Sequence, residues 1–158
     1  MKAYDPNVPL ISIHVPKCGG SSLRKVLEKW FGPQFYPHYP NEADGTVPPM
    51  AQIRSIWPWR VWERGVCLHG HFNRLRGLGV EQRYPKIDQF VTMLRDPFEV
   101  CLSNYFYARR LGDRWFRDGA KRQLPDFAEY ISKAESYIPH HFHAGLSTES
   151  IPDYFERH

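Results

Sequence analysis

A glycine turn near the N-terminus has the composition of an anion-binding loop. Adjacent glycines let a backbone curve around an anion, and the following helix N-terminus offers N–H groups and the positive end of its dipole. Lys17 would add a cation, and Ser21 and Ser22 would add hydroxyl donors. The turn differs from the GxxxxGK[ST] loop because Lys17 precedes the glycines, and an ordinary strand-to-helix turn is the alternative. The segment reads Pro16-Lys17-Cys18-Gly19-Gly20-Ser21-Ser22.

A second candidate site follows the apolar run Phe90–Leu94. Arg95 comes directly after this run, and Ser103 stands two turns into the helical pattern that comes next. Residues at the carboxyl ends of parallel strands border the crevice where ligands bind. A guanidinium group can bind a terminal phosphate through two hydrogen bonds, and Ser103 could donate to the same group. The alternative is an Arg95 that pairs with a nearby carboxylate and a Ser103 that is solvated.

The tripeptide His69-Gly70-His71 places two imidazoles two positions apart in an extended apolar segment. Such side chains point to one face of a strand, so the rings are expected side by side. An imidazole can remove a proton from an attacking hydroxyl. A metal centre is the alternative, but no partner ligands stand nearby. The other histidine cluster fits no standard zinc spacing and is more simply a polar loop; it comprises His140, His141 and His143.

Strand and helix patterns alternate along the chain. Asp96, Pro97 and Glu99 have the positions of an N-cap, a first helical residue and a third helical residue. Leu23, Val26, Leu27 and Trp30 follow the spacing of a buried helical stripe. Three strands are expected, at Leu10–Val15, Val66–Phe72 and Phe90–Leu94. Besides the short helix named below, three helices are expected, at Leu23–Trp30, Pro97–Leu111 and Pro125–Ala134.

The segments between these elements are expected to be irregular. They are residues 32–60, with one short helix near Met50–Ile56, and residues 73–87. Strands that alternate with helices predict an α/β fold with a mainly parallel central sheet flanked by helices. A length of 158 residues suits a single domain, residues 1–158.

Composition narrows the classes of function. A net charge of +4 favours anionic partners, although a solvated basic surface is an equal alternative. No apolar run is long enough to span a bilayer, and the N-terminus lacks a signal-peptide pattern. The three cysteines form no CxxC pair and are too few for a disulfide framework. These features predict a cytoplasmic protein with reduced thiols and no membrane span.

The three motifs, in this order, resemble the sulfotransferase superfamily that uses 3′-phosphoadenosine-5′-phosphosulfate (PAPS), in particular its carbohydrate branch with the heparan sulfate 2-O-sulfotransferases. Ile13–Leu23 resembles the family's 5′-phosphosulfate loop, with Cys18 where the family usually has Thr. Leu94–Tyr105 resembles its 3′-phosphate motif, and His69–His71 resembles the segment that holds the catalytic base. The resemblance covers roughly residues 10–111.

The resemblance implies a three-layer fold like that of P-loop proteins and in-line transfer of a sulfuryl group to a hydroxyl acceptor. It implies that His71 is the general base with His69 beside it, that Arg95 and Ser103 hold the 3′-phosphate, and that Lys17 also stabilises the departing nucleotide. PAPS would be the donor and adenosine 3′,5′-bisphosphate (PAP) the product, without a metal. The acceptor would be a carbohydrate, with anionic glycans as candidates. The 5′ phosphosulfate would be held by Lys17, Cys18, Gly19, Gly20, Ser21 and Ser22.

The family pattern continues with a further strand and a helical segment that complete the nucleotide pocket. This chain ends at Phe155-Glu156-Arg157-His158, about where that strand should begin. The resemblance therefore implies a domain that is either shortened at its C-terminal end or rebuilt there in an unusual way.

Two other functions remain open at this stage. A kinase-like phosphotransferase could use the same loop, but it would need Mg²⁺ and an acidic ligand for it. Asp96 is the evident candidate, and its capping position makes it a poor one. A non-catalytic module for polyanions could use the basic stretches Arg74–Arg83 and Arg109–Arg122. Nothing in the sequence indicates specific nucleic-acid recognition.

Overall fold

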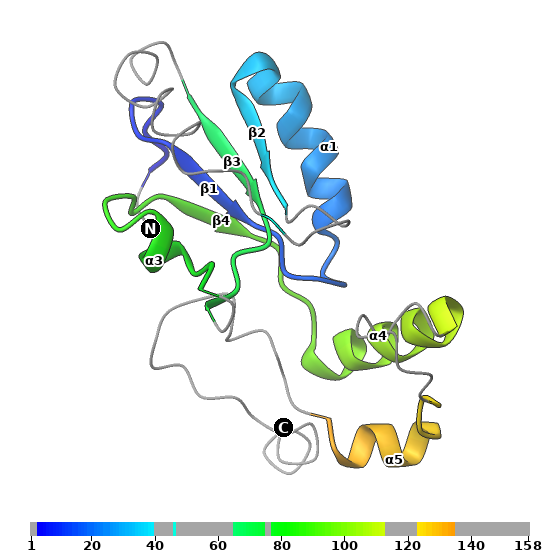
Figure 1. Ribbon diagram of the computed structural model, residues 1–158. Coiled ribbons are helices and arrows are strands. Elements are labelled where there is room, and N and C mark those ends of the chain that lie inside the picture. Colours follow the sequence, from blue (N-terminus) through cyan, green and yellow to red (C-terminus); the bar gives the residue numbers. More distant parts are fainter. Residues whose placement is uncertain (1–2, 40–45, 47–64, 75–76, 113–122, 135–158) are drawn as a thin grey trace.

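The computed structural model describes residues 3–39, 46, 65–74, 77–112 and 123–134. These residues form a four-stranded, fully parallel sheet with the order β2-β3-β1-β4. The strands are β1 (Leu10–Ile13), β2 (Phe35–His38), β3 (Cys67–Gly70) and β4 (Phe90–Thr92). The mainly parallel sheet expected from the sequence is therefore confirmed, and all four strands end at the same edge (Figure 1).

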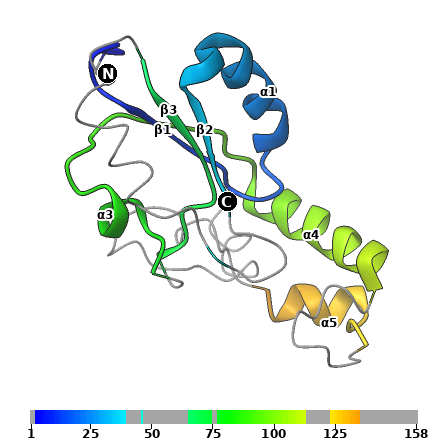
Figure 2. The same ribbon diagram turned by 45° about the horizontal axis from the view of Figure 1, so that its top comes forward.

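Side chains alternate between the two faces of the sheet, and each face has its own apolar cluster. Leu10 and Cys67 pack with Leu27 of α1 (Gly20–Phe31) on one face. Ile11 and Ile13 lie in the cluster on the other face. That second cluster includes Val80 of α3 (Val80–Arg83) and Val100 of α4 (Pro97–Leu111). Helices thus cover both faces, and Figure 2 shows the sheet between α1 and α3.

The start of α4 follows the expected capping pattern. The Asp96 carboxylate accepts hydrogen bonds from the N–H groups of Phe98 and Glu99 at 3.0 and 3.2 Å. Pro97 occupies the first helical position, where no N–H is needed. The short helix α5 (Phe127–Ser132) begins in the same way at Asp126 and lies alongside α4 (Figures 1 and 2).

Helix α1 differs from the expected buried stripe. Leu27 is buried and Leu23 packs beside it, but Val26 and Trp30 are exposed, with Trp30 76% accessible. Phe31 takes the next place in the apolar row instead, four residues after Leu27. The prediction for positions 26 and 30 was wrong because the helix contacts the sheet along a narrow i, i+4, i+8 row.

Two elements lie in segments that were expected to be irregular. Strand β2 contains Pro37, a residue that is tolerated in a sheet at its edge, and β2 is an edge strand. The one-turn helix α3 is too short to give a periodic signal, although Val80 and Tyr84 enter the core. The helix expected near Met50–Ile56 lies outside the described residues.

Among the described helices, none is both long enough and apolar enough to cross a lipid bilayer.

Candidate functional site

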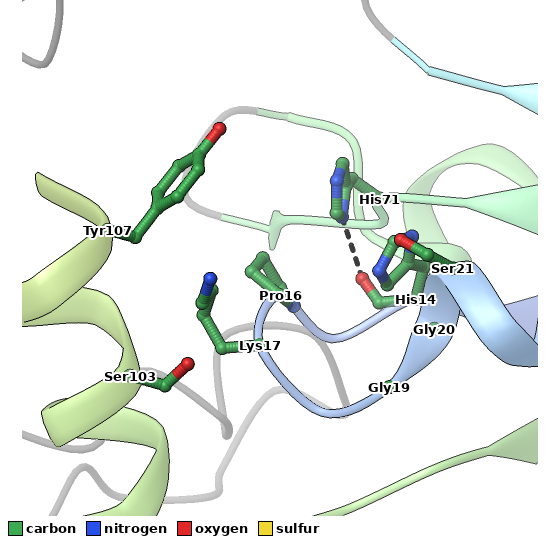
Figure 3. A pocket seen from close by; sticks show the side chains of 9 residues that line it. All are labelled: His14, Pro16, Lys17, Gly19, Gly20, Ser21, His71, Ser103 and Tyr107. Carbon is green, nitrogen blue, oxygen red and sulfur yellow. Dashed lines mark hydrogen bonds between the residues drawn. The ribbon is translucent and has the colours of Figure 1, made fainter. Parts of the chain in front are cut away.

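A cavity of about 450 Å³ lies beyond the carboxyl ends of the strands. The loop after β1, the first residue after β3 and the middle of α4 all contribute to its wall (Figure 3). Segments that are up to about ninety residues apart in the sequence therefore meet at one point. The lining residues are His14, Pro16, Lys17, Gly19, Gly20, Ser21, His71, Ser103 and Tyr107.

The loop after β1 turns sharply into α1. Lys17 and Gly19 both have positive φ angles, 65° and 83°, and Gly19 is the N-cap of α1. Within the described residues no side chain caps this helix, and its first turn carries no acidic residue. The N-terminal N–H groups and the positive end of the helix dipole therefore border the cavity, and no acidic residue of the first turn neutralises them. This arrangement suits a bound phosphate or sulfate group.

The ammonium group of Lys17 lies on the side of this loop that faces helix α4. Its Nζ is 4.2 Å from the centroid of the Tyr107 ring, a cation–π contact, and the Arg110 guanidinium lies 5.1 Å from the same centroid. Partial burial, followed by the positive charges of Arg110 and Arg95, lowers the pKa of Lys17 from its ordinary value. This corner of the cavity is thus strongly positive and favours an anionic ligand.

The geometry of His71 determines which ring nitrogen can act as a base. Its Nδ1 lies 2.7 Å from the backbone carbonyl oxygen of His14. A carbonyl oxygen can only accept, so Nδ1 must carry the proton and donate. In the neutral ring the lone pair then resides on Nε2. His71 lines the cavity, so the structure provides a histidine with its basic nitrogen defined by a backbone contact.

His69 occupies a different environment from His71. It is fully buried, with 0% of its surface accessible, and Nδ1 lies 2.8 Å from Oγ of Ser12, its cross-strand partner. Both His69 and His71 stack on the ring of His14, at 5.3 and 4.5 Å between centroids. The side-by-side placement expected for the two imidazoles thus involves a third ring. His69 itself does not line the cavity.

The burial of His69 predicts a loss of stability in acid. Burial above all, with the Arg24 charge second, lowers the pKa of His69 from 6.5 to about 4, and burial also lowers the pKa of His38. The unfolded chain therefore takes up protons first as the pH falls from about 6.5 to about 4, and the folded state loses stability across that window. For His69 alone the loss is roughly 3 kcal/mol. Urea unfolding between pH 7.5 and 4.5 measures it.

The control for this prediction replaces the buried pair together, His69→Phe with Ser12→Ala, so that no hydroxyl is left unsatisfied. The free energy of unfolding of this variant, referred to its own value at pH 7.5, should fall less steeply with acid than that of the wild type. An unchanged slope would show that other groups cause the acid sensitivity.

Arg95 and Ser103 are placed differently with respect to the cavity. Ser103 lines it, whereas Arg95 lies outside the lining and pairs with Glu99, Nε to Oε2 at 2.7 Å. This pairing with a nearby carboxylate is the arrangement that the alternative interpretation of Arg95 anticipated. The pair is about half exposed and spaced i, i+4, so it contributes only a few tenths of a kcal/mol. Turning the guanidinium toward a phosphate would therefore cost little.

The weakness of this ion pair leads to a prediction about ligand affinity. If Arg95 contacts the 3′-phosphate of a nucleotide, Glu99→Gln removes the competing carboxylate and should tighten the binding of PAP by about two-fold. Arg95→Ala should weaken it by roughly ten-fold or more. Calorimetric titration of both variants measures the two expected changes in the Kd for PAP. An equal change in this Kd for the two substitutions would rule out a phosphate contact by Arg95.

Two other predicted residues lie at the margin of the site. Cys18 points into the core with 3% of its surface accessible, and burial raises its thiol pKa. Only its backbone could therefore serve a ligand. Ser22 is exposed on the first turn of α1, and its N–H already donates to the Gly19 carbonyl oxygen at 3.0 Å.

The sequence analysis missed two residues that line the cavity, His14 and Tyr107. Tyr107 stands four positions after Ser103 in α4, so helical spacing alone would have placed it on the same face. His14 stands between β1 and the glycine turn, where any side chain must border the ligand-binding edge of the sheet. A close contact also fixes its position: a Cβ on Gly20 would lie 1.9 Å from His14 Cδ2.

Within the part of the chain that the structure describes, no group of three or more His, Cys, Asp or Glu side chains is arranged to hold a metal ion. The cluster of His140, His141 and His143 lies outside that part. Comparison of the chain with protein-family models, with curated proteins and with solved structures finds no match.

Proposed function

We propose that this protein is a sulfotransferase that moves the sulfuryl group of PAPS to a hydroxyl acceptor, with a carbohydrate as the favoured acceptor class. The acceptor oxygen forms a bond to sulfur while the bond from sulfur to the bridging oxygen of the 5′-phosphate breaks. The acceptor's proton passes to Nε2 of His71, and the bridging oxygen keeps the electron pair of the broken bond. The products are the sulfated acceptor and PAP.

The observation that carries this proposal is that each of the three sequence motifs contributes at least one residue to one cavity, although Arg95 and His69 lie outside its lining. Lys17 and Ser21 come from the loop after β1, His71 from the end of β3, and Ser103 from α4 (Figure 3). A cation, an uncapped helix N-terminus and a histidine in one cavity provide what transfer of an anionic group to a hydroxyl requires.

Several of the lining residues have roles that follow from their chemistry. Lys17 and the N-terminal N–H groups of α1 bind the 5′ phosphosulfate and stabilise the negative charge that develops on the bridging oxygen. Ser21 and Ser103 offer hydroxyl donors for the two ends of the nucleotide. His71 takes the proton of the attacking hydroxyl on Nε2. Its Nδ1–H donates to the His14 carbonyl oxygen, so the lone pair of the neutral ring is on Nε2. We also propose that the fold is of the three-layer kind found in P-loop proteins.

The kinase alternative is weaker on this geometry. Phosphoryl transfer would require an acidic side chain to hold Mg²⁺. The Asp96 carboxylate, the evident candidate, accepts hydrogen bonds from two N–H groups at the start of α4, and it does not line the cavity. The sulfotransferase reaction needs no metal in this proposal, since Lys17 and the helix N-terminus supply the positive charge.

Transfer of ³⁵S from labelled PAPS tests the proposed function. The full chain is incubated in the presence of EDTA with neutral oligosaccharides, anionic oligosaccharides, a phenol and a sterol. The proposal predicts label in an oligosaccharide, with loss of transfer in Lys17→Ala and retention in Lys25→Ala, an exposed lysine of α1 outside the cavity. In a parallel assay with Mg²⁺ and ATP in place of EDTA and PAPS, transfer of phosphate by a chain that transfers no sulfuryl group would support the kinase instead. Salt-sensitive glycan binding without any transfer would indicate a binding module.

A further inference from the structure

His14 has no step of its own in the proposed reaction, yet it contacts the candidate base and the glycine turn. Its ring stacks on His71 at 4.5 Å with an interplanar angle of 30°. The same ring packs over Gly20, where no Cβ could fit. Its backbone carbonyl oxygen accepts the Nδ1–H of His71. One residue therefore contacts the candidate base through both its main chain and its side chain.

The ring of His14 is in turn held by Tyr39, the first residue after β2. The distance between Nδ1 of His14 and the phenol oxygen of Tyr39 is 2.7 Å. Tyr39 is partly buried, and burial raises its pKa to about 12, so the phenol keeps its proton at neutral pH. The edge of the Tyr39 ring also meets His71, at 5.0 Å between centroids and 86° between planes.

Together these contacts limit the motion of the His71 ring. The His14 ring covers one face of the His71 ring, and the edge of the Tyr39 ring packs against the His71 ring. The His14 carbonyl oxygen accepts the hydrogen bond from Nδ1 of His71. A free imidazole exchanges its proton between two nitrogens and rotates about its Cβ–Cγ bond. In this site such rotation would break the hydrogen bond to the carbonyl and the stack on His14 together.

We propose that His14 and Tyr39 are a positioning pair that holds His71 in its Nδ1-protonated form, with Nε2 as the basic nitrogen in the cavity. The inference rests on the proposed function only in naming His71 as the base of sulfuryl transfer. Tyr39 does not line the cavity and acts on His71 through His14, so loss of its hydroxyl lowers the turnover number and leaves the affinity for the nucleotide nearly unchanged.

Nitrogen-15 NMR of the histidine rings in the ligand-free full chain tests the positioning directly, because the two tautomers have distinct ¹⁵N shifts. Wild-type His71 should show the Nδ1–H form. Tyr39→Phe and His14→Ala keep the His14 carbonyl oxygen but loosen the ring packing that holds Nδ1 against it, so both should give a mixture of the two forms. Tyr36→Phe, which removes a hydroxyl from the neighbouring strand β2, is the matched control and should behave as the wild type. An unchanged His71 tautomer in both test variants would overturn the proposal.

Kinetics supply the second readout. Tyr39→Phe should lower kcat by roughly 10- to 100-fold, because small errors in the placement of a reacting group have effects of that size, while the Kd for PAP stays within about two-fold of the wild type. A change in Kd with constant kcat would assign Tyr39 to the nucleotide site and contradict the inference. If the wild type neither binds PAP nor transfers sulfate, the proposed function fails, and the NMR result still decides whether the pair positions His71.

Discussion

His71→Ala is expected to reduce the turnover number by roughly 10²–10⁴-fold while leaving the affinity for PAP close to that of the wild type. The substitution removes the imidazole whose Nε2 is proposed to take the acceptor's proton, and it leaves Lys17 and the N-terminus of α1 in place. Single-turnover transfer from labelled PAPS measures the rate, and calorimetry with PAP measures the affinity.

Exogenous imidazole provides the control for this variant. The truncated side chain leaves space in a cavity of about 450 Å³, so added imidazole should restore part of the lost rate to His71→Ala and none to Lys17→Ala. Full activity of His71→Ala without imidazole would show that another group is the base. A parallel loss of nucleotide affinity would show that His71 serves binding rather than proton transfer.

Gly70→Ala is expected to have the largest effect on stability, about 3–5 kcal/mol and enough to unfold much of the protein. A Cβ at this position would lie 1.8 Å from the backbone carbonyl oxygen of His38 and 2.5 Å from its carbonyl carbon. Both atoms belong to β2, whose residue His38 is the register partner of Gly70. A backbone clash cannot be relieved by a rotamer change, so β2 must move away from β3.

The consequence reaches the site, because the N–H of His71 donates to the same His38 carbonyl oxygen at 3.2 Å. Thermal unfolding followed by circular dichroism measures the effect. Gly77→Ala is the matched control, since a Cβ there meets no atom of the described residues within 4 Å and the positive φ of 68° opposes it, at a cost of about 1–2 kcal/mol. Equal melting temperatures for the two variants would contradict the tight approach of β2 to β3.

Local signals in the sequence were sufficient for the elements that border the site. The Asp96-Pro97 pair fixed the start of α4, because a capping carboxylate and a residue without an N–H satisfy the first turn by themselves. The β-prone segments Leu10–Val15 and Val66–Phe72 predicted β1 and β3, which are shorter than expected at Leu10–Ile13 and Cys67–Gly70.

Other features depend on tertiary contacts that no local pattern contains. Strand β2 forms through its pairing with β3 although Pro37 weakens its own signal. The difference between the buried His69 and the cavity-lining His71 arises from the end of β3 at Gly70, which a run of apolar residues does not mark. The approach of Lys17 to Tyr107 requires α4 to return to the edge of the sheet, ninety residues later.

Calorimetric titration of PAP into the full chain tests the central claim most directly, with AMP as competitor and with Lys17→Ala and Lys25→Ala as variants. The account predicts saturable binding that AMP displaces poorly, because AMP lacks the 3′-phosphate. It predicts a loss of roughly ten-fold or more in affinity for Lys17→Ala, the usual effect of removing a charged hydrogen bond, and no change for Lys25→Ala. A folded protein that binds PAP no better than AMP, or that binds it equally well without Lys17, would contradict a sulfotransferase site in this cavity.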